Sequence, residues 1–489
     1  MFAFLSAMFG LVLFNNLMWM LTMWEVTTVC SFFLIGYTKT AEATANSFRQ
    51  IWMNMLGGIA FTLALIYMGS QMHTLELSTF VSRGGASASL AMLPLALLAF
   101  AALTKAAQMP FHTWLLGAMV APTPTSALLH SSTMVKAGVF LLIRLSPLMG
   151  TYLATGGNTA VLNPVGISVM LVGATTFLVC SLIAISQSNA KRVLAYSTVA
   201  NLGLIVTCAG IGTAAAVWAG VFLLIFHAVA KSLLFLCVGT AEHHIGSRDI
   251  ESMDALVSRM PKLACLMALG ICGMFVAPFG MLISKWAALG AFIDSGVLVL
   301  IVMMGFGSAA TFFFWAKWLG KILCNVQGQD NLERDVHKSE WVALAVMAFG
   351  VVALAVALPC VSSTIVTPYV KRLVGGSMLA PSPSDLAIMA VSAVVVVIVP
   401  LIVALRAKKR SAVAEMPHLG GVGLSQTSFA GALGGEVSTA QRAWYMESIF
   451  DEKQLSRIGS IACILIALAG IACSVGLSYV FINLMGSVI

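Results

Sequence analysis

Long apolar stretches along almost the whole chain limit how this sequence can fold more than any other feature. A helix that crosses a bilayer needs about 20 apolar residues. Such segments must satisfy their own backbone polar groups, which a continuous helix does. Only 9% of the residues are charged, against about 25% in soluble domains. The sequence therefore predicts an all-α, polytopic membrane protein with about thirteen transmembrane helices, at 2–14, 16–37, 50–70, 87–107, 126–149, 165–187, 195–211, 215–240, 263–293, 296–318, 341–361, 384–405 and 459–485.

Lysine and arginine gather in the short loops on one side of these predicted spans. The loops 150–164 and 212–214, on the opposite side, contain neither residue type. Because basic loops stay in the cytoplasm, we expect a multi-pass protein of the cell inner (cytoplasmic) membrane with its basic side facing the cytoplasm. The net charge of +8 then reflects topology, and no nucleic-acid partner is expected.

Two of the predicted spans contain a proline-phenylalanine pair near a lysine. Pro110 follows Lys105, and Pro278 precedes Lys285. Proline removes a backbone donor and interrupts a helix. These are the fourth and ninth spans, and a unit of five helices that is repeated once must be inverted in the membrane. The sequence therefore predicts two inverted five-helix repeats, each with a broken helix, as in many transporters.

This repeat divides the chain into five segments. We expect a first five-helix repeat at 1–149, a second at 165–320, additional transmembrane helices at 341–405, a cytoplasmic connecting segment at 406–458, and a C-terminal transmembrane helix at 459–489.

Several ionisable residues lie inside the predicted spans, where they usually face a bundle interior or a water path. They are candidates for proton translocation: Glu25, Lys105, His130, Lys136, His227, Lys231 and Lys285. His227 and Lys231 are four residues apart and share a helical face. They repel each other when both are protonated, which suits a proton relay. The alternatives are structural ion pairs, a histidine bonded to a carbonyl, and lysines that snorkel to the interface.

The sequence lacks motifs for cofactors or chemistry of its own. There is no phosphate-binding loop and no dinucleotide-binding glycine pattern, and the ten cysteines are scattered singly without a metal-site spacing. We therefore expect no catalytic residue, no metal and no cofactor in this chain, which would depend on an ion gradient or a partner for energy. His243 and His244 are expected to be solvated in a loop.

Four segments together resemble one superfamily: "WEVTTVCSFFLIGY", "LTKAAQMPFHTWLLGAMVAPTPTSALLHSSTMVKAGVFLL", "AKRVLAYSTVANLG" and "FHAVAKSLLFL". It comprises the antiporter-like subunits of respiratory complex I, of Mrp-type Na⁺/H⁺ antiporters and of energy-converting membrane-bound [NiFe] hydrogenases. The resemblance runs over residues 1–330. Members usually carry further helices before the position of Met1, so we expect helices to be missing at this end, through truncation or gene splitting.

The resemblance also implies roles for the buried charges. Glu25 and Lys105 would form the carboxylate–lysine pair of a first half-channel, with His130 as a relay at the helix break. His227 and Lys231 would lie on a central water-filled axis, and Lys285 would be the terminal lysine at the second broken helix. Lys136 matches a lysine that only some members have, and Leu223 stands where the complex I branch has a further histidine, which puts the length of the relay in question.

The segments "PFGMLISKWAA" and "RAWYMESIFDEKQL" look more like the energy-converting hydrogenase (Ech-type) branch. That branch implies a proton- or sodium-translocating subunit, coupled to ferredoxin oxidation and hydrogen evolution in a soluble arm that carries the [NiFe] centre and iron–sulfur clusters. The alternatives are the equivalent subunit of a formate-linked or quinone-reducing complex, an Mrp-type Na⁺/H⁺ antiporter, and a non-conducting membrane scaffold.

Overall fold

A computed structural model of the protein describes most of residues 1–375 and the C-terminal helix. The described ranges are 1–86, 88–150, 152–154, 160–254, 256–275, 279–323, 332–375, 428–430, 436–438 and 445–486, with single helical residues at 391, 394, 398 and 402. Pro278, nearly all of the span predicted at 384–405, and most of the predicted connecting segment lie outside these residues.

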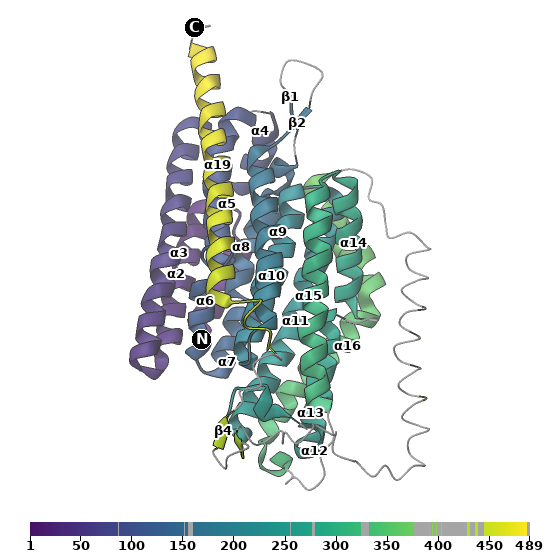
Figure 1. Cartoon of the computed structure of the whole chain (residues 1–489). Coiled ribbons are helices and arrows are strands. Elements are labelled where there is room, and N and C mark those ends of the chain that lie inside the picture. The colour runs from purple at the N-terminus through teal and green to yellow at the C-terminus, as the bar shows by residue number, and fades with distance from the viewer. Residues whose placement is uncertain are drawn as a thin grey trace.

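Helices make up nearly all of the described structure (Figure 1). The first part of the chain contains α1 (Phe2–Leu13), α2 (Leu17–Ile35), η1 (Gly36–Thr38), α3 (Ala41–Tyr67), η2 (Met68–Met72), α4 (Leu77–Ala86), α5 (Ala88–Lys105), α6 (Thr113–Gly117), η3 (Ala118–Val120), α7 (Thr123–Ser126), η4 (Ala127–Ser132) and α8 (Met134–Met149).

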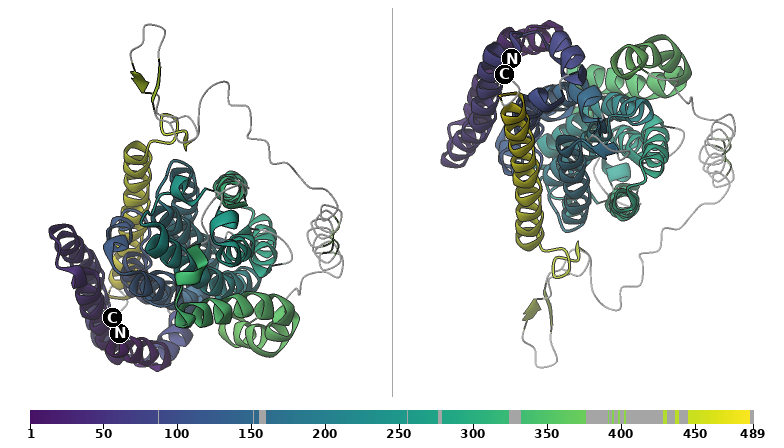
Figure 2. Two further views of the ribbon diagram at one scale, coloured as in Figure 1. Left: turned by 90° about the horizontal axis from the view of Figure 1, so that it is seen from below. Right: turned by 90° about the horizontal axis from the view of Figure 1, so that it is seen from above.

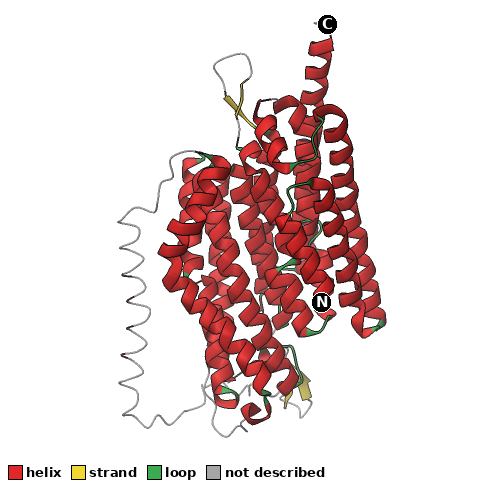
Figure 3. Cartoon of the chain, turned by 180° about the vertical axis from the view of Figure 1, so that it is seen from behind, coloured by secondary structure: helices red, strands yellow, loops and turns green. Residues whose placement is uncertain are grey.

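The rest of the chain is also mostly helical. It contains α9 (Pro164–Ile185), α10 (Ala190–Ile211), α11 (Ala214–Ile245), η5 (Glu251–Met253), α12 (Leu256–Arg259), α13 (Pro261–Phe275), α14 (Gly280–Asp294), α15 (Leu298–Leu323), η6 (Leu332–Asp335), α16 (Lys338–Val361), η7 (Ser362–Val366), α17 (Thr367–Val374) and α19 (Glu452–Gly486). Two antiparallel pairs of short strands, β1 (Tyr152–Ala154) with β2 (Ala160–Leu162) and β3 (Ser428–Ala430) with β4 (Glu436–Ser438), lie at the ends of the bundle (Figure 3).

The prediction of an all-α, polytopic membrane protein is confirmed. Within the described residues, 10 helical segments are long and apolar enough to cross a membrane, and two shorter apolar helices, Phe2–Leu13 and Leu90–Lys105, accompany them. The span predicted at 126–149 is not one regular helix, because the π-helical η4 ends at Ser132 and Thr133 separates it from α8. The span predicted at 50–70 begins earlier, at Ala41, where the Thr40 side chain caps the Ala43 N–H at 3.1 Å.

The helices form a bundle whose centre is α10. Every residue of α10 except Arg192 is buried. Seen along the bundle, α1–α3 form an arc at one edge, α14–α16 lie at the opposite side, and α19 runs along the outside between the arc and α9 (Figure 2). We call the two ends of the bundle the α4 end and the α12 end, after the short helices that mark them in Figure 1.

Two matching backbone bridges relate the halves of the bundle. Asn16 pairs with Glu76, and Asn189 pairs with Asp249, so the two bridges have the same sequence separation. Both asparagines also cap the helix that follows, α2 and α10 respectively. The first bridge precedes α4 and the second precedes α12, and Figure 1 shows these helices at opposite ends. This is the relation expected for an inverted repeat, although the exact segment boundaries stay a prediction.

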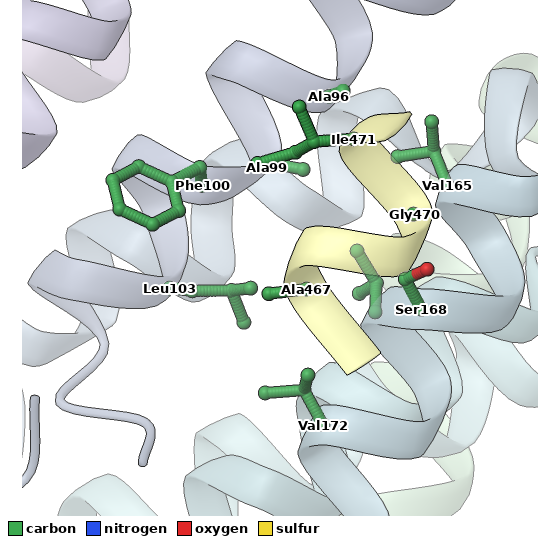
Figure 4. Close-up of a pocket in the computed structure, with 11 residues that line it drawn as sticks. Ala96, Ala99, Phe100, Leu103, Val165, Ser168, Val172, Ala467, Gly470 and Ile471 are labelled. Atoms are coloured by element: carbon green, nitrogen blue, oxygen red, sulfur yellow. The ribbon is translucent and has the colours of Figure 1, made fainter. Parts of the chain in front are cut away.

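The C-terminal helix α19 contacts the bundle at its start and again further along its length. At its start, Glu452 accepts hydrogen bonds from Arg192, from the Tyr196 hydroxyl at 2.9 Å and from Gln187 at 2.9 Å. Further along, Gly470 lies over α5 and α9 in a crevice whose lining is apolar except for Ser168 (Figure 4). A Cβ atom at Gly470 would lie 2.1 Å from the Ser168 hydroxyl oxygen, so only glycine allows this close approach.

The segment before α19 is fixed at the α12 end. The Tyr445 hydroxyl donates to Glu251 at 2.5 Å, and the Lys317 ammonium lies 4.1 Å from the centre of the Tyr445 ring. Burial, together with the Glu251 carboxylate, raises the pKa of Tyr445, so this phenol stays protonated and keeps its role as a donor.

Candidate ion-translocation site

The first broken helix places Lys105 inside the bundle. Helix α5 ends at Lys105 and α6 begins only at Thr113, so the break predicted at Pro110 is present. The Trp114 indole donates to the Thr104 carbonyl at 3.0 Å, which satisfies one of the backbone groups freed at the break. Lys105 is fully buried. Its ammonium donates to the Trp24 carbonyl at 3.0 Å and to the Thr28 hydroxyl at 2.7 Å.

Glu25 lies between the two α2 residues that bind Lys105, but it does not bind the lysine itself. Within the described part of the chain, Glu25 forms no ion pair, and its Oε1 atom is buried without a hydrogen-bond partner. The carboxylate lines a cavity of about 380 Å³ between α2 and α3. Gly58 makes room for it, since a Cβ there would lie 2.3 Å from Oε1. The expected Glu25–Lys105 ion pair is therefore not formed in this structure, and its role stays a prediction.

His130 occupies an irregular, fully buried place beside the break. It lies in the π-helical η4, between the rings of Trp114 and Phe235, whose centroids are 6.5 and 6.2 Å from its own. Both ring nitrogens of His130 are buried, and the backbone of Ala118 lies close enough to hydrogen-bond to the ring. The relay and the alternative of a histidine bonded to a carbonyl both stay predictions.

Lys136 and His227 meet in the middle of the bundle. Their side chains come from α8 and α11, both are buried, and Nζ shares a hydrogen bond of 2.5 Å with Nδ1. One of the two nitrogens must accept and so must carry a lone pair. The contact can therefore hold one proton between two bases. The sequence placed these residues in one site but did not predict their direct contact.

Lys231 lies one helical turn beyond His227 on α11 and is fully buried. Its ammonium donates to the Leu194 carbonyl at 3.1 Å and to the Ser197 hydroxyl, both on α10. It also lies 4.8 Å from the centre of the Trp315 ring. These contacts offset part of the cost of burying a charge.

Lys285 completes the set at the second broken helix. It lies on α14, which packs against α11, and its ammonium is 5.9 Å from the centre of the Phe177 ring. Only 6% of the residue is exposed. Successive helix contacts, α5 with α8, α8 with α11 and α11 with α14, therefore connect a row of buried bases. We call it the basic row: Lys105, His130, Lys136, His227, Lys231 and Lys285.

A further buried cation was not predicted as part of the interior. Lys191 lies between the predicted spans 165–187 and 195–211, and thus in a predicted loop, but its side chain is buried in the first turn of α10 and pairs with Glu242 at 2.7 Å. Glu242 also binds Arg248. The pair lines a cavity of about 650 Å³ near the α12 end. No feature of the sequence signalled this burial, because Lys191 lies two residues after Asn189 in the polar stretch SQSNAKR.

A helical bundle with buried ionisable residues and broken helices is typical of ion-translocating membrane proteins. The family described as NADH:quinone oxidoreductase/Mrp antiporter, TM, matches residues 15–311 of this chain. The chain belongs to this family, and it is a multi-pass, antiporter-like membrane subunit of the complex I and Mrp superfamily.

Two of the curated relatives carry the names of probable or putative antiporter components. The A/B component of a probable K⁺/H⁺ antiporter of Rhizobium meliloti is 40% identical over 279 residues, which cover 56% of this chain and 27% of that protein. The putative antiporter subunit mnhA2 of Staphylococcus epidermidis is 33% identical over 362 residues, 68% of this chain and 44% of that protein. The chain thus spans less than half the length of these relatives.

Two solved structures share the fold. The Mrp complex from a Dietzia species matches with a TM-score of 0.67 and 28% identity, over 84% of this chain and 45% of that chain. The archaeal membrane-bound sulfane sulfur reductase, a respiratory membrane complex, matches with a TM-score of 0.69 over 76% of this chain and 74% of that chain. Its 22% identity shows the fold alone. Both structures are of complexes. None of these four proteins is named a hydrogenase, so the hydrogenase branch stays a prediction.

Proposed function

We propose that this chain provides the proton pathway of an Mrp-type cation/proton antiporter. The observation that supports it best is the basic row, and above all the shared hydrogen bond between Lys136 and His227. A structural scaffold would gain little from two bases that compete for one proton at the centre of a bundle. A proton path needs such pairs, because each group must be able both to accept and to release a proton.

The chemistry of the basic row favours protons over sodium or potassium. Its side chains are amines and imidazoles, which bind protons through nitrogen lone pairs. Hard metal cations prefer oxygen ligands and are repelled by protonated amines. We therefore assign proton movement to this row and expect the metal cation to cross elsewhere in the complex. The names of the two curated relatives, a probable K⁺/H⁺ antiporter component and a putative antiporter subunit, support an exchange function for the complex.

Within the row, α11 would act as the central relay. His227 can exchange a proton with Lys136 through their hydrogen bond, and Lys231 lies on the same face of α11 one turn away. The Ser197 and Leu194 oxygens hold the protonated form of Lys231 by accepting from its ammonium. Lys285, on the neighbouring helix α14, would receive or supply protons at the second break.

The test replaces Lys231 by Met in the assembled complex in sealed vesicles. We expect Lys231→Met to slow cation-driven proton movement, followed with a pH-sensitive dye, by at least about tenfold, which corresponds to about 1.4 kcal/mol in barrier height. Lys338→Met, at an exposed lysine at the start of α16, is the matched control and should behave like the unmodified protein. Normal proton movement in Lys231→Met would overturn the proposal.

A further inference from the structure

Two histidines and a glutamate meet at the α12 end, away from the basic row. His243 and His244 lie in the last turn of α11, and Glu340 lies in the first turn of α16. One nitrogen of each imidazole and one carboxylate oxygen all lie within 4.8 Å of one another. The two imidazole rings have centroids 5.0 Å apart. Three side chains with metal-binding atoms, from two different helices, thus converge on one point.

The surroundings of these three side chains suit a bound cation. His243 and Glu340 line the cavity of about 650 Å³, so an ion can reach them. Within the described structure, the Nε2 atom of His244 is buried and has no hydrogen-bond partner. The Thr240 hydroxyl donates to one Glu340 oxygen at 2.8 Å, which orients the carboxylate. A buried imidazole nitrogen without a partner, beside an oriented carboxylate, is the feature that an ion would satisfy.

The nearby cationic side chains do not prevent a metal ion from binding at these three residues. Lys191 and Arg248 line the same cavity, but both are bound to Glu242. Glu340 instead accepts from the neutral hydroxyl of Thr240, and neither cation is its partner.

The donor set identifies the class of ion. Two imidazoles and one carboxylate are the protein ligands of many zinc sites that leave a fourth position for water. Mg²⁺ and Ca²⁺ instead require mostly oxygen ligands. Zinc binds each nitrogen at about 2.0–2.1 Å, so the three ligand atoms must move closer together when the ion binds. The His243 side chain is exposed at the helix end and can rotate toward the ion. We propose that His243, His244 and Glu340 form a binding site for a transition-metal ion of the Zn²⁺ class.

A metal ion at this place would join α11 to α16. Helix α11 also carries His227 and Lys231, so a bound ion would restrain the helix that holds the centre of the basic row. We therefore expect Zn²⁺ to inhibit proton movement. This second step rests on the proposed transport function, whereas the binding step does not.

Binding is tested by calorimetric titration of the full chain in mild detergent with Zn²⁺ and, separately, Mg²⁺, after chelator treatment. We expect one Zn²⁺ site and no Mg²⁺ binding, and at least tenfold weaker Zn²⁺ binding in His244→Ala and in Glu340→Gln. His73→Ala, at an exposed histidine that precedes α4, is the matched control and should bind as the unmodified chain does. His243→Ala, at an exposed position, provides a variant that keeps the packing if the others do not fold. Failure of the unmodified chain to bind Zn²⁺, or equal binding by all variants, overturns the site.

Inhibition is tested in sealed vesicles as the ratio of rates with and without Zn²⁺. Zn²⁺ should slow proton movement by the unmodified complex, whereas the ratio of the two rates should approach one in Glu340→Gln. A ratio of one in the unmodified complex overturns the inhibitory role. Absence of any proton movement contradicts the proposed function instead, while the calorimetric result still decides whether the site exists.

Discussion

Each buried lysine of the basic row keeps its ammonium close to oxygen atoms, a second base or an aromatic ring. Lys105 binds the Trp24 carbonyl and the Thr28 hydroxyl, and its ammonium lies 5.1 Å from the centre of the Trp24 ring. Lys231 has the same combination of a carbonyl, a hydroxyl and an indole. A buried charge without partners costs several kcal/mol, so these contacts explain how the residues are tolerated.

Glu25 is the residue whose role depends most on a change of partner. Its buried Oε1 atom has no hydrogen-bond partner in the described structure, while Lys105 binds the residues on either side of it. We therefore expect a second arrangement, in which Lys105 pairs with the Glu25 carboxylate.

The first prediction concerns this pair. We expect Glu25→Gln and Lys105→Ala each to slow proton movement in vesicles by a similar factor, at least about tenfold. The double variant should be little slower than either single variant, because both report one interaction. Glu76→Gln, at a carboxylate at the α4 end outside the basic row, serves as the control. Losses that simply multiply in the double variant would show that Glu25 and Lys105 act separately.

Among the helices, α19 is the one whose docking is least evident from its sequence. It begins at Glu452, beyond the family match that ends at residue 311, yet it covers the outer side of the first break. Ser456 of α19 lies 3.0 Å from the His112 ring nitrogen, two residues after Pro110. Polar contacts thus set the position of the helix along its axis, and the close approach at Gly470 sets its distance from α5 and α9.

The second prediction uses two glycines of α19 that differ in their surroundings. Gly470 is buried and a Cβ there would meet Ser168, whereas a Cβ at Gly476 would meet nothing within 4 Å. We expect Gly470→Ala to lower the free energy of unfolding by about 1–3 kcal/mol through overpacking. Gly476→Ala should raise it by up to about 1 kcal/mol through helix propensity. Thermal unfolding in detergent measures both, and changes of the same sign would contradict this docking of α19.

At the scale of the whole molecule, the outer face of α2 and α3 combines exposed apolar side chains with a carboxylate. Large apolar side chains on α2 and α3 are exposed, among them Trp19, Phe33, Trp52 and Ile66. The half-buried Glu25 lies between the same two helices. Lipid can cover the apolar side chains, but a carboxylate in the hydrocarbon region needs a polar neighbour. We therefore expect another membrane subunit of the complex to pack on the α2–α3 side.

The third prediction is that the chain copurifies with other integral-membrane proteins in mild detergent. If the complex is an Mrp-type antiporter, these partners should be membrane subunits without nickel or iron. A copurifying soluble arm that contains nickel and iron–sulfur clusters and oxidises ferredoxin would instead favour the hydrogenase branch predicted from the sequence. Isolation of the chain alone, under conditions that preserve other membrane complexes, would contradict both. Mass spectrometry and metal analysis of the purified material decide between these results.

The sequence by itself determined the helices and the set of buried ionisable residues. In hydrocarbon an apolar run of about 20 residues has little choice but to form a helix, and a charge within such a run must face inward. This is why Lys105, Lys231 and Lys285 could be named from the sequence, and why the break at Pro110 could be located.

Only the tertiary structure decided which of these residues touch. Lys136 and His227 are 91 residues apart, and their contact depends on the rotation of α8 against α11. The same holds for Lys191, which looked like a loop residue until α11 brought Glu242 to it, and for His244 and Glu340, which meet where α11 ends and α16 begins. Helix formation depends on neighbours in sequence, whereas the rotation and depth of each helix depend on side-chain packing against helices that are distant in sequence. No local pattern encodes those contacts.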